Sequence, residues 1–487
     1  MAITEYYIVA SFTPSVNFDK LFTLISNIIV TLHDQKFETL MTAKYIFIFF
    51  LSVVLFSSCG RKNNQIKSEL DTKMDNIAEN YVKLVLRIGQ LDGDFVDAYY
   101  GPKDWQPHDV IKTSADSLSL RNECNAETDS LLNSLDALKN YKANELETLR
   151  YRFLYKQLLA VKAKLFMIGG GTFTFDQESK ALYDAEAPVY SEDHFKTILD
   201  KLDKILPGHG SISKRLDDYK KGFIIPKDKL QQVFDAAIKE CRKRTAEHIQ
   251  LPAGENFSVE YVTGKPWGGY NWYKGNYYSL IQINTDLPIY IDRAIELAAH
   301  EGYPGHHVYN SLLEENLVKG KGWVEFTVYP LFSPQSLIAE GTANFGIKMI
   351  FPGDEKIKFE KDVLFPLAGI DPAKADEYNK VLDLVNELSF ASNEAARNLI
   401  DNKWNKQQTL QWLEKYSLMS PAKAEHFLSF IMKYRSYVIN YNVGEKLIEN
   451  YVDKNGGTEN HPEKRWELFK YLLTTPQTPS GLSGALL

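Results

Sequence analysis

The sequence predicts a mainly α-helical protein with one small β-sheet, and two observations carry this prediction. From Glu69 onward, apolar residues recur at steps of three and four, which is the period of an amphipathic helix. The region from Phe257 to Ile283 instead alternates in period two and is rich in Tyr, Val, Trp and Gly, which is typical of strands. We therefore expect a small sheet directly upstream of the segment that holds the candidate chemistry.

The clearest helix is expected over residues 146–168, where five apolar side chains fall on one face before three glycines end the pattern. Similar stretches predict helices over the ranges 70–90, 115–140, 191–206, 228–248, 373–400 and 421–452. Two strands are expected within FSVEYV and YYSLIQI. No repeat or Gly/Ser linker follows residue 70, so residues 69–487 are expected to form a single domain, with or without two lobes around a cleft.

Composition excludes several classes of protein. The chain has 487 residues, of which 44% are hydrophobic, so it can bury a large core. With 56 Lys and Arg against 63 Asp and Glu, the net charge of -7 argues against a nucleic-acid partner. Three cysteines without a C-x-x-C pair make neither a disulfide framework nor a thiolate metal site. Any metal ion is therefore expected to be held by His, Asp or Glu.

The segment from Lys44 to Cys59 has the layout of a signal peptide: one positive charge, an apolar run of about twelve residues, then small residues before a cysteine. It resembles the lipobox of bacterial lipoproteins, in which the cysteine is acylated. We expect residues 1–40 to be a miscalled upstream segment, 41–58 the signal peptide and 59–68 a tether. The alternative is an ordinary membrane anchor or a buried helix. The first interpretation predicts a membrane-anchored protein of the bacterial cell envelope, on the periplasmic or the surface side, held by lipid on Cys59.

Three of the ten histidines lie within the run AAHEGYPGHH, as His300, His306 and His307. The apolar segment before them is expected to be helical, so His300 and Glu301 would lie at its C-terminal end. In zincins, one helix supplies two imidazoles to zinc and a glutamate that serves as general base. The histidines would otherwise cap helices or form hydrogen bonds within a core.

Pro304 makes this segment different from the H-E-x-x-H pattern of zincins. A proline at this position does not donate to the carbonyl of His300, and its ring clashes there, so the helix must kink or stop. On an unbroken helix neither His306 nor His307 would return to His300. The glycines on both sides of Tyr303 and Pro304 allow the chain to loop one histidine back.

A third ligand is predicted downstream. Ser333 and Pro334 mark a helix start, with a hydroxyl cap followed by proline in the first turn. Glu340 then falls in the middle of this helix among apolar residues, where a lone carboxylate is costly unless it is paired or binds a cation. Glu340 is therefore a ligand candidate, the alternative being a carboxylate exposed to solvent.

The runs HEGYPGHH and EGTANFG, together with the cysteine segment, resemble the bacterial domain of unknown function 885 family, whose motifs are HE-x-x-PGH and EGWA. That family is similar to the neurolysin-like and carboxypeptidase Taq-like metallopeptidases. The resemblance implies a helical zincin-like fold with a deep cleft and one Zn²⁺ per chain. It implies that His300, His306 and Glu340 bind the zinc ion and that Glu301 is the general base.

The resemblance leaves open whether His306 or His307 binds the metal. The other histidine would then lie behind the metal ligands. A further segment, YVINYNVGEKL, resembles a family segment that maps a tyrosine to Tyr441. Tyr441, or alternatively Arg435 or Tyr437, would donate to the oxyanion of the reaction. For each of these three residues, a packed aromatic ring or a surface cation is the competing interpretation.

The sequence therefore predicts a zinc-dependent hydrolase that cleaves peptides. A second hypothesis is a non-catalytic lipoprotein that keeps the zincin fold to bind peptides or partner proteins. A third is a metal-dependent hydrolase of non-peptide amides or esters.

Overall fold

The structure, a computed structural model, describes residues 69–108, 113–140, 143–265 and 267–484. The chain divides into two units, Met1–Ser68 and Glu69–Leu487, and every described residue belongs to the second. The upstream segment, the signal peptide, the tether and Cys59 of the sequence analysis lie outside the described residues. Across the described part of the chain, no helix is both long and apolar enough to cross a membrane.

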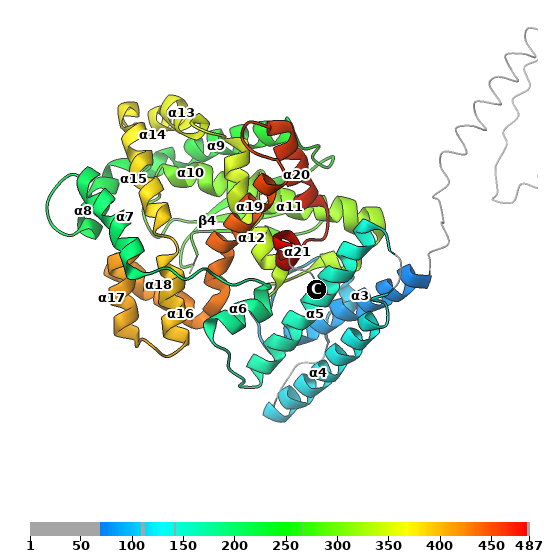
Figure 1. Cartoon of the computed structure of the whole chain (residues 1–487). Coiled ribbons are helices and arrows are strands. Elements are labelled where there is room, and N and C mark those ends of the chain that lie inside the picture. Colours follow the sequence, from blue (N-terminus) through cyan, green and yellow to red (C-terminus); the bar gives the residue numbers. More distant parts are fainter. Residues whose placement is uncertain (1–68, 109–112, 141–142, 266, 485–487) are drawn as a thin grey trace, which may run out of the picture. The chain divides into compact units, whose positions relative to one another are not determined.

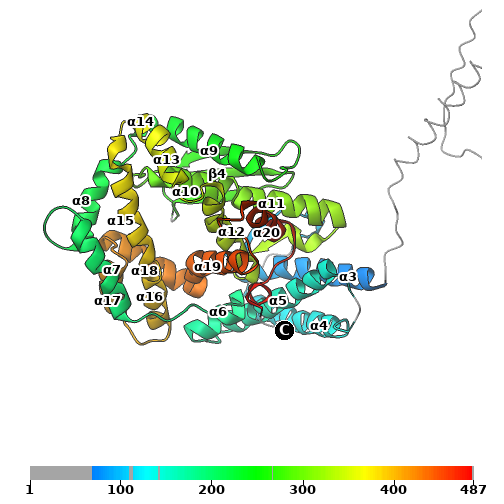
Figure 2. The same ribbon diagram turned by 45° about the horizontal axis from the view of Figure 1, so that its top comes forward.

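The protein is mainly helical, as predicted. The helices that precede the predicted sheet are α3 (Glu69–Ile88), α4 (Ser114–Asp136), α5 (Glu145–Ile168), α6 (Phe175–Tyr183), α7 (Glu192–Ile205), α8 (Ile212–Lys220) and α9 (Leu230–Ala246), with short 3-10 turns η1 (Lys103–Trp105), η2 (Lys221–Phe223) and η3 (Lys227–Lys229). Helices α3, α4 and α5 pack side by side (Figures 1 and 2). Helix α5 begins at a capping box of Asn144 and Glu147 and ends at Gly169, so the expected glycine end is confirmed.

The predicted sheet has three strands rather than two: β2 (Asn256–Val262), β3 (Gly269–Tyr273) and β4 (Tyr278–Asn284), in the order β2-β4-β3. Strand β4 pairs in parallel with β2 and antiparallel with β3. A second, two-stranded antiparallel sheet pairs β1 (Val96–Tyr99) with β5 (Val328–Pro330). The sequence analysis missed β1, β3 and β5 because three to five residues carry too little periodicity to be recognised.

The helices that follow are α10 (Asp292–Leu297), α11 (His306–Leu313), α12 (Pro334–Ile350), α13 (Glu355–Phe359), α14 (Phe365–Ala368), α15 (Ala375–Glu387), α16 (Ala391–Ile400), α17 (Lys406–Tyr416), α18 (Pro421–Tyr434), α19 (Ile439–Lys454), α20 (Pro462–Thr474) and α21 (Pro479–Ser483). Between them lie the π-helical turns η4 (Ala298–Gly302), η5 (Glu314–Lys319) and η7 (Glu360–Leu364) and the 3-10 turns η6 (Val324–Thr327), η8 (Pro372–Lys374) and η9 (Arg435–Val438). The stretches predicted over 373–400 and 421–452 are each two helices, because the chain turns at Leu388–Phe390 and at Arg435, which has a φ of 55°.

Two hydrophobic clusters form the interior. The large one contains most of the buried apolar side chains, including those of α3, α5, α9 and α12. The smaller one joins side chains of α7, α8, α15, α16 and α17, among them Phe195, Leu202, Val381, Leu388 and Tyr416. Helix α12 is almost entirely buried and packs along α19 near the centre of Figure 2. This central helix carries Glu340.

The start of α12 corrects a detail of the sequence analysis. Ser333 is the N-cap residue and Pro334 opens the helix, as predicted, but the Ser333 side chain makes no capping hydrogen bond. Its hydroxyl instead donates to the carbonyl oxygen of Pro330 at 2.8 Å. The hydroxyl therefore holds the end of β5 rather than the first turn of α12.

Helices α12 and α19 approach closely where Gly341 faces Gly444. A Cβ atom added at Gly341 would lie 2.5 Å from the carbonyl carbon and oxygen of Gly444, which are backbone atoms and cannot move aside cheaply. We expect Gly341→Ala to lower the free energy of unfolding by about 1–3 kcal/mol, as overpacking does. Chemical denaturation of this variant beside Gly93→Ala, where an added Cβ meets nothing within 4 Å, tests this. Equal stabilities would show that the crossing is not tightly packed.

Candidate metal centre

The helix is interrupted between His300 and His306, as the sequence analysis predicted from Pro304. Helix α10 continues into the π-helical turn η4, which ends at Gly302, and α11 begins at His306. The amide of Gly305 donates to the carbonyl of Ala299 at 2.9 Å. A Cβ atom at position 305 would lie 1.9 Å from the carbonyl oxygen of His300, so only glycine allows this approach. The break brings the second histidine back beside the first.

Three donor side chains meet at this turn. The Nε2 atoms of His300 and His306 are 3.1 Å apart. Glu340 places Oε2 at 3.3 Å from Nε2 of His300 and Oε1 at 3.8 Å from Nε2 of His306. Ligands at about 2.0–2.1 Å from one zinc ion in a tetrahedral site are about 3.3 Å from each other. The three groups therefore have the spacing of zinc ligands.

Glu340 is an incompletely bonded carboxylate in the interior. The residue is about 7% exposed. Oε1 accepts a hydrogen bond from the Tyr437 hydroxyl at 3.0 Å, whereas the buried Oε2 atom has no hydrogen-bond partner. A buried carboxylate oxygen without a partner is costly unless a cation faces it. The residues at this turn therefore fit a divalent metal ion.

Asn344 orients the first imidazole. Its Oδ1 atom lies 2.8 Å from Nδ1 of His300, so Nδ1 donates to it and the Nε2 atom is directed to the centre. The Asn344 amide also donates to the carbonyl of Tyr441 at 3.1 Å. The sequence analysis missed this residue. Its spacing of four from Glu340 on one helix was a usable signal, because such residues share a helix face.

Glu301 lies beside the two imidazoles. One of its oxygens and one nitrogen from each of His300 and His306 lie within 4.8 Å of one another. The Asn271 amide on strand β3 donates to the Glu301 carbonyl at 2.6 Å and ties the π-helical turn to the sheet. Burial raises the pKa of Glu301 to about 7, and the charge of Glu340 adds to this. A carboxylate with this pKa is suited to accept a proton near neutral pH.

The two imidazoles have opposite pKa shifts. Burial opposes the charged form of His300, but the adjacent Glu340 and Glu301 outweigh it and raise the pKa of His300 to about 9. Burial lowers the pKa of His306 to about 4, and the charge of His300 adds to this. Burial also opposes ionisation of Glu340, yet its neighbours His300 and His306 lower its pKa. The centre therefore favours one positive charge in front of Glu340, which is what a bound cation supplies.

Tyr441 lies in the first turn of α19. Burial of its hydroxyl group, together with the charges of Glu340 and Glu301, raises the pKa of Tyr441 well above the ordinary value, although 40% of the residue's surface is exposed. A side chain that is near both carboxylates and still reached by solvent is placed where a substrate can meet it. Its neighbour Tyr437 is buried, with ring centroids 5.8 Å apart, and is committed to Glu340.

Two of the alternative candidates have other partners. The Arg435 Nε donates to Glu178 at 2.6 Å, and the Ser436 hydroxyl donates to the same carboxylate at 2.7 Å. Arg435 therefore holds α6 against η9 rather than facing the centre. His307 is buried, with its ring nitrogens at 2.9 Å from the Ser279 hydroxyl and 3.0 Å from Glu255. With both nitrogens engaged there, His307 does not join the donor group, whereas His306 does.

Asp97 is a further acidic residue near the centre that the sequence analysis missed. It lies at the irregular pairing of β1 with β5, and such a bulge re-aims a side chain. The Tyr270 hydroxyl on β3 donates to its carboxylate. Burial raises the pKa of Asp97 to about 7, and the charges of Glu340 and Glu301 add to this. No local sequence pattern distinguishes Asp97, because the tertiary fold brings β1 here.

Asp97→Asn is expected to stabilise the protein at high pH when a chelator is present. Because the pKa of Asp97 is raised from 3.8 to about 7, the free energy of unfolding of the wild-type protein falls as pH rises through this range. Asparagine has no such loss, so the advantage of the variant grows from pH 4 to 7 and reaches up to about 4 kcal/mol at pH 8. Unfolding of both proteins at pH 4, 6 and 8 measures the difference. A difference independent of pH would contradict the burial of a charged Asp97.

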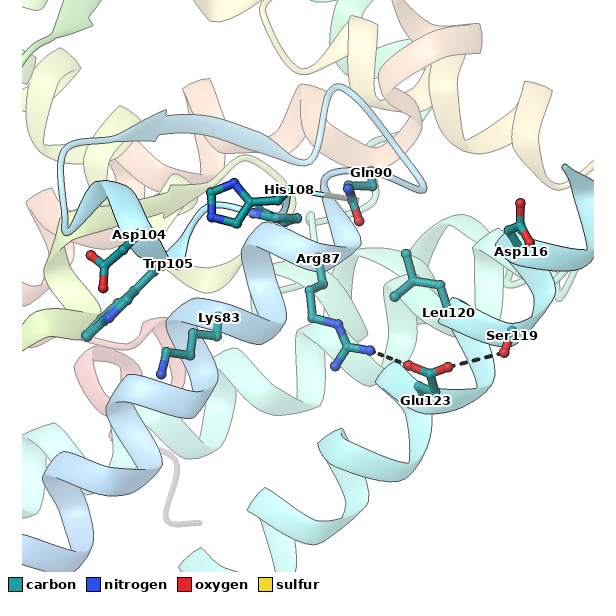
Figure 3. A pocket seen from close by; sticks show the side chains of 11 residues that line it. Lys83, Arg87, Gln90, Asp104, Trp105, His108, Asp116, Ser119, Leu120 and Glu123 are labelled. Carbon is teal, nitrogen blue, oxygen red and sulfur yellow. Dashed lines mark hydrogen bonds and ion pairs between the residues drawn. The ribbon is translucent and has the colours of Figure 1, made fainter. Parts of the chain in front are cut away.

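A cavity of about 560 Å³ lies elsewhere, between α3, η1 and α4 (Figure 3). None of the predicted site residues lines it. Of its basic residues, Arg87 is paired with Glu123 at 2.6 Å and with Glu127 at 2.7 Å, and Lys83 is paired with Glu79 at 2.6 Å. These cations are therefore held in ion pairs, and the cavity is separate from the centre formed by His300.

The fold and the donor group define a mainly helical protein with a candidate mononuclear metal centre. No protein-family model and no curated protein matches the chain. The chain is similar to the crystal structure of a candidate lipoprotein from Colwellia psychrerythraea, with a TM-score of 0.47 and 15% identity over 76% of this chain and 62% of that one. It is also similar to a candidate lipoprotein of unknown function from Shewanella oneidensis, with a TM-score of 0.34 and 13% identity over 73% of each chain.

The chain thus spans 62% of the length of the Colwellia protein. A likeness with these TM-scores carries no conclusion about activity. The resemblance to the domain of unknown function 885 family, and the zincin-like fold that it implies, stay predictions that rest on the motifs around His300, Glu340 and Tyr441.

Proposed function

We propose that the protein is a zinc-dependent hydrolase and that its substrates are peptides. The observation that carries this proposal is the spacing of 3.1 to 3.8 Å among His300, His306 and Glu340. The Oε2 atom of Glu340 supports the same conclusion, because it has no hydrogen-bond partner and faces Nε2 of His300 at 3.3 Å, where the charge of a zinc ion would satisfy it.

His300, His306 and Glu340 would hold the ion. Bound zinc supplies a Lewis acid that makes water a better nucleophile and polarises a carbonyl group. With three protein ligands, such a site would keep room for water or substrate, which distinguishes a catalytic from a structural zinc site. Two of the ligands are imidazoles and one is a carboxylate, a set known from zinc peptidases.

The protein side chains would move the protons. Glu301, beside the imidazoles, accepts the proton of the attacking water and then delivers it to the nitrogen of the leaving amine. The Tyr441 hydroxyl donates a hydrogen bond to the carbonyl oxygen as negative charge develops on it. Asn344 keeps the His300 ring in place throughout, since it accepts from Nδ1.

A digest of a peptide mixture tests this proposal. Purified protein is incubated with the mixture with and without a chelator, and the products are identified by mass spectrometry. The expected result is cleavage that the chelator stops and added zinc restores. Model esters are assayed in the same way. Cleavage of the esters but not of the peptides would favour a hydrolase of other substrates. Zinc binding without cleavage of peptides or esters would favour the non-catalytic lipoprotein.

We also propose that the protein is a lipoprotein of the bacterial cell envelope. The support is the lipobox-like segment that ends at Cys59, in the part of the sequence before the described residues. Mass spectrometry of the mature N-terminus is expected to find an acylated Cys59. An unmodified chain that begins upstream of Met41 would contradict both the lipid anchor and the proposed start.

A further inference from the structure

A second polar cluster contacts the turn that carries the histidines. Its centre is Glu255, the residue just before strand β2. The Oε2 atom of Glu255 accepts from the Tyr303 hydroxyl at 2.7 Å and lies 3.0 Å from Nε2 of His307. The Oε1 atom accepts from Arg242 at 2.6 Å. The Ser279 hydroxyl, on strand β4, lies 2.9 Å from Nδ1 of His307.

These contacts hold both sides of the bend between the two histidines. Tyr303 precedes Pro304 and Gly305, and His307 directly follows His306. Both side chains bond to Oε2 of Glu255, so the residues before and after the bend are held to the same carboxylate oxygen. Ser279 and Glu255 belong to the sheet region, which gives this carboxylate a rigid support.

We propose that Glu255 is a positioning residue that sets the separation of the two imidazoles of His300 and His306. This inference rests on the proposed zinc-dependent function. His307 then has a definite role: it ties the first turn of α11 to Glu255 and thereby orients the preceding His306. Partners behind the ligands of a metal ion fix the orientation of those ligands and contribute to affinity.

The ionisation of Glu255 agrees with this positioning role. Burial alone would raise the pKa of Glu255, but hydrogen bonds from His307, Tyr303 and Arg242 outweigh it and lower the pKa. Glu255 therefore stays ionised at neutral pH and accepts strong hydrogen bonds from these three side chains. The Ser279–His307–Glu255 series has the residue types of a hydrolytic triad, but Ser279 is 0% exposed and no substrate reaches its hydroxyl.

Two variants test the positioning role of Glu255. Glu255→Gln removes the charge while keeping the size, and Tyr303→Phe removes one hydrogen bond while keeping the ring. We expect Glu255→Gln to weaken zinc binding about 10–100-fold and Tyr303→Phe to weaken it less, measured by competition with a chromophoric chelator. With Co²⁺ in place of zinc, the visible absorption bands of both variants are expected to shift, because they report ligand geometry.

The matched control is Glu360→Gln. Glu360 is also a buried carboxylate, bonded by Asn379 at 2.7 Å and paired with Lys356 at 3.1 Å, but it belongs to η7. This variant is expected to melt at a lower temperature with wild-type zinc affinity and an unchanged cobalt spectrum.

The outcomes separate the inference from the proposed function. If the wild-type protein binds zinc and Glu255→Gln and Tyr303→Phe both match its affinity and cobalt spectrum, Glu255 is a structural residue only and the proposed function stands. If the wild-type protein binds no zinc, the proposed function fails and the positioning role fails with it. The Tyr303→Phe variant keeps the test decisive if Glu255→Gln does not fold.

Discussion

Glu301→Gln is expected to abolish most hydrolysis while zinc stays bound. The amide does not accept a proton from water, and loss of a general base costs about 10²–10⁴-fold in kcat. The metal ligands are untouched, so about one zinc ion per chain should remain, as expected for a site with three protein ligands. Assays of kcat and zinc content on one preparation make the test.

The control is Glu315→Gln, which neutralises an exposed carboxylate of η5 and should leave kcat unchanged. Full activity in a Glu301→Gln variant that retains its zinc would show that another group takes the proton. Loss of zinc together with activity would instead make Glu301 a ligand, and its position within 4.8 Å of both imidazoles makes this outcome informative.

His300→Ala is expected to remove the metal itself. The substitution deletes one ligand and also leaves the Oε2 atom of Glu340 without its neighbour at 3.3 Å. Zinc affinity should fall by more than about 100-fold, the upper range for loss of a partner behind a ligand. Because a buried carboxylate then loses its counter-charge, the metal-free variant should also be less stable by about 3–5 kcal/mol.

Equilibrium dialysis against zinc and chemical denaturation of the chelated protein measure these two effects. His194→Ala, which replaces an exposed histidine of α7, is the control and should keep both affinity and stability. Zinc binding by His300→Ala at wild-type strength would place the metal elsewhere.

Local features of the sequence were sufficient to predict part of the centre. Pro304 required a break in the helix, and the structure has one, followed by a new helix that begins at His306. Glu340 fell in the middle of an apolar helix, and its burial in α12 agrees with that position. Both predictions depend only on backbone chemistry and on the period of a helix, which are visible within about a dozen residues.

Other features depend on long-range packing and were not predictable. Arg435 was one of two alternatives to Tyr441 as the oxyanion donor, but its Nε atom donates to Glu178 of α6. Asp97 and Glu255 come from β1 and from the start of β2, and only the tertiary fold brings them near the histidines. These contacts cannot be predicted from sequence spacing, because tens to hundreds of residues separate Asp97 and Glu255 from the histidines.

The location of the metal ion itself is the most direct test of the central claim. Anomalous diffraction at the zinc absorption edge, from crystals of protein grown with zinc, should show a single strong peak at about 2.0–2.2 Å from Nε2 of His300, Nε2 of His306 and a carboxylate oxygen of Glu340. Absence of a peak between these three side chains, or a strong peak at another position, would contradict the account.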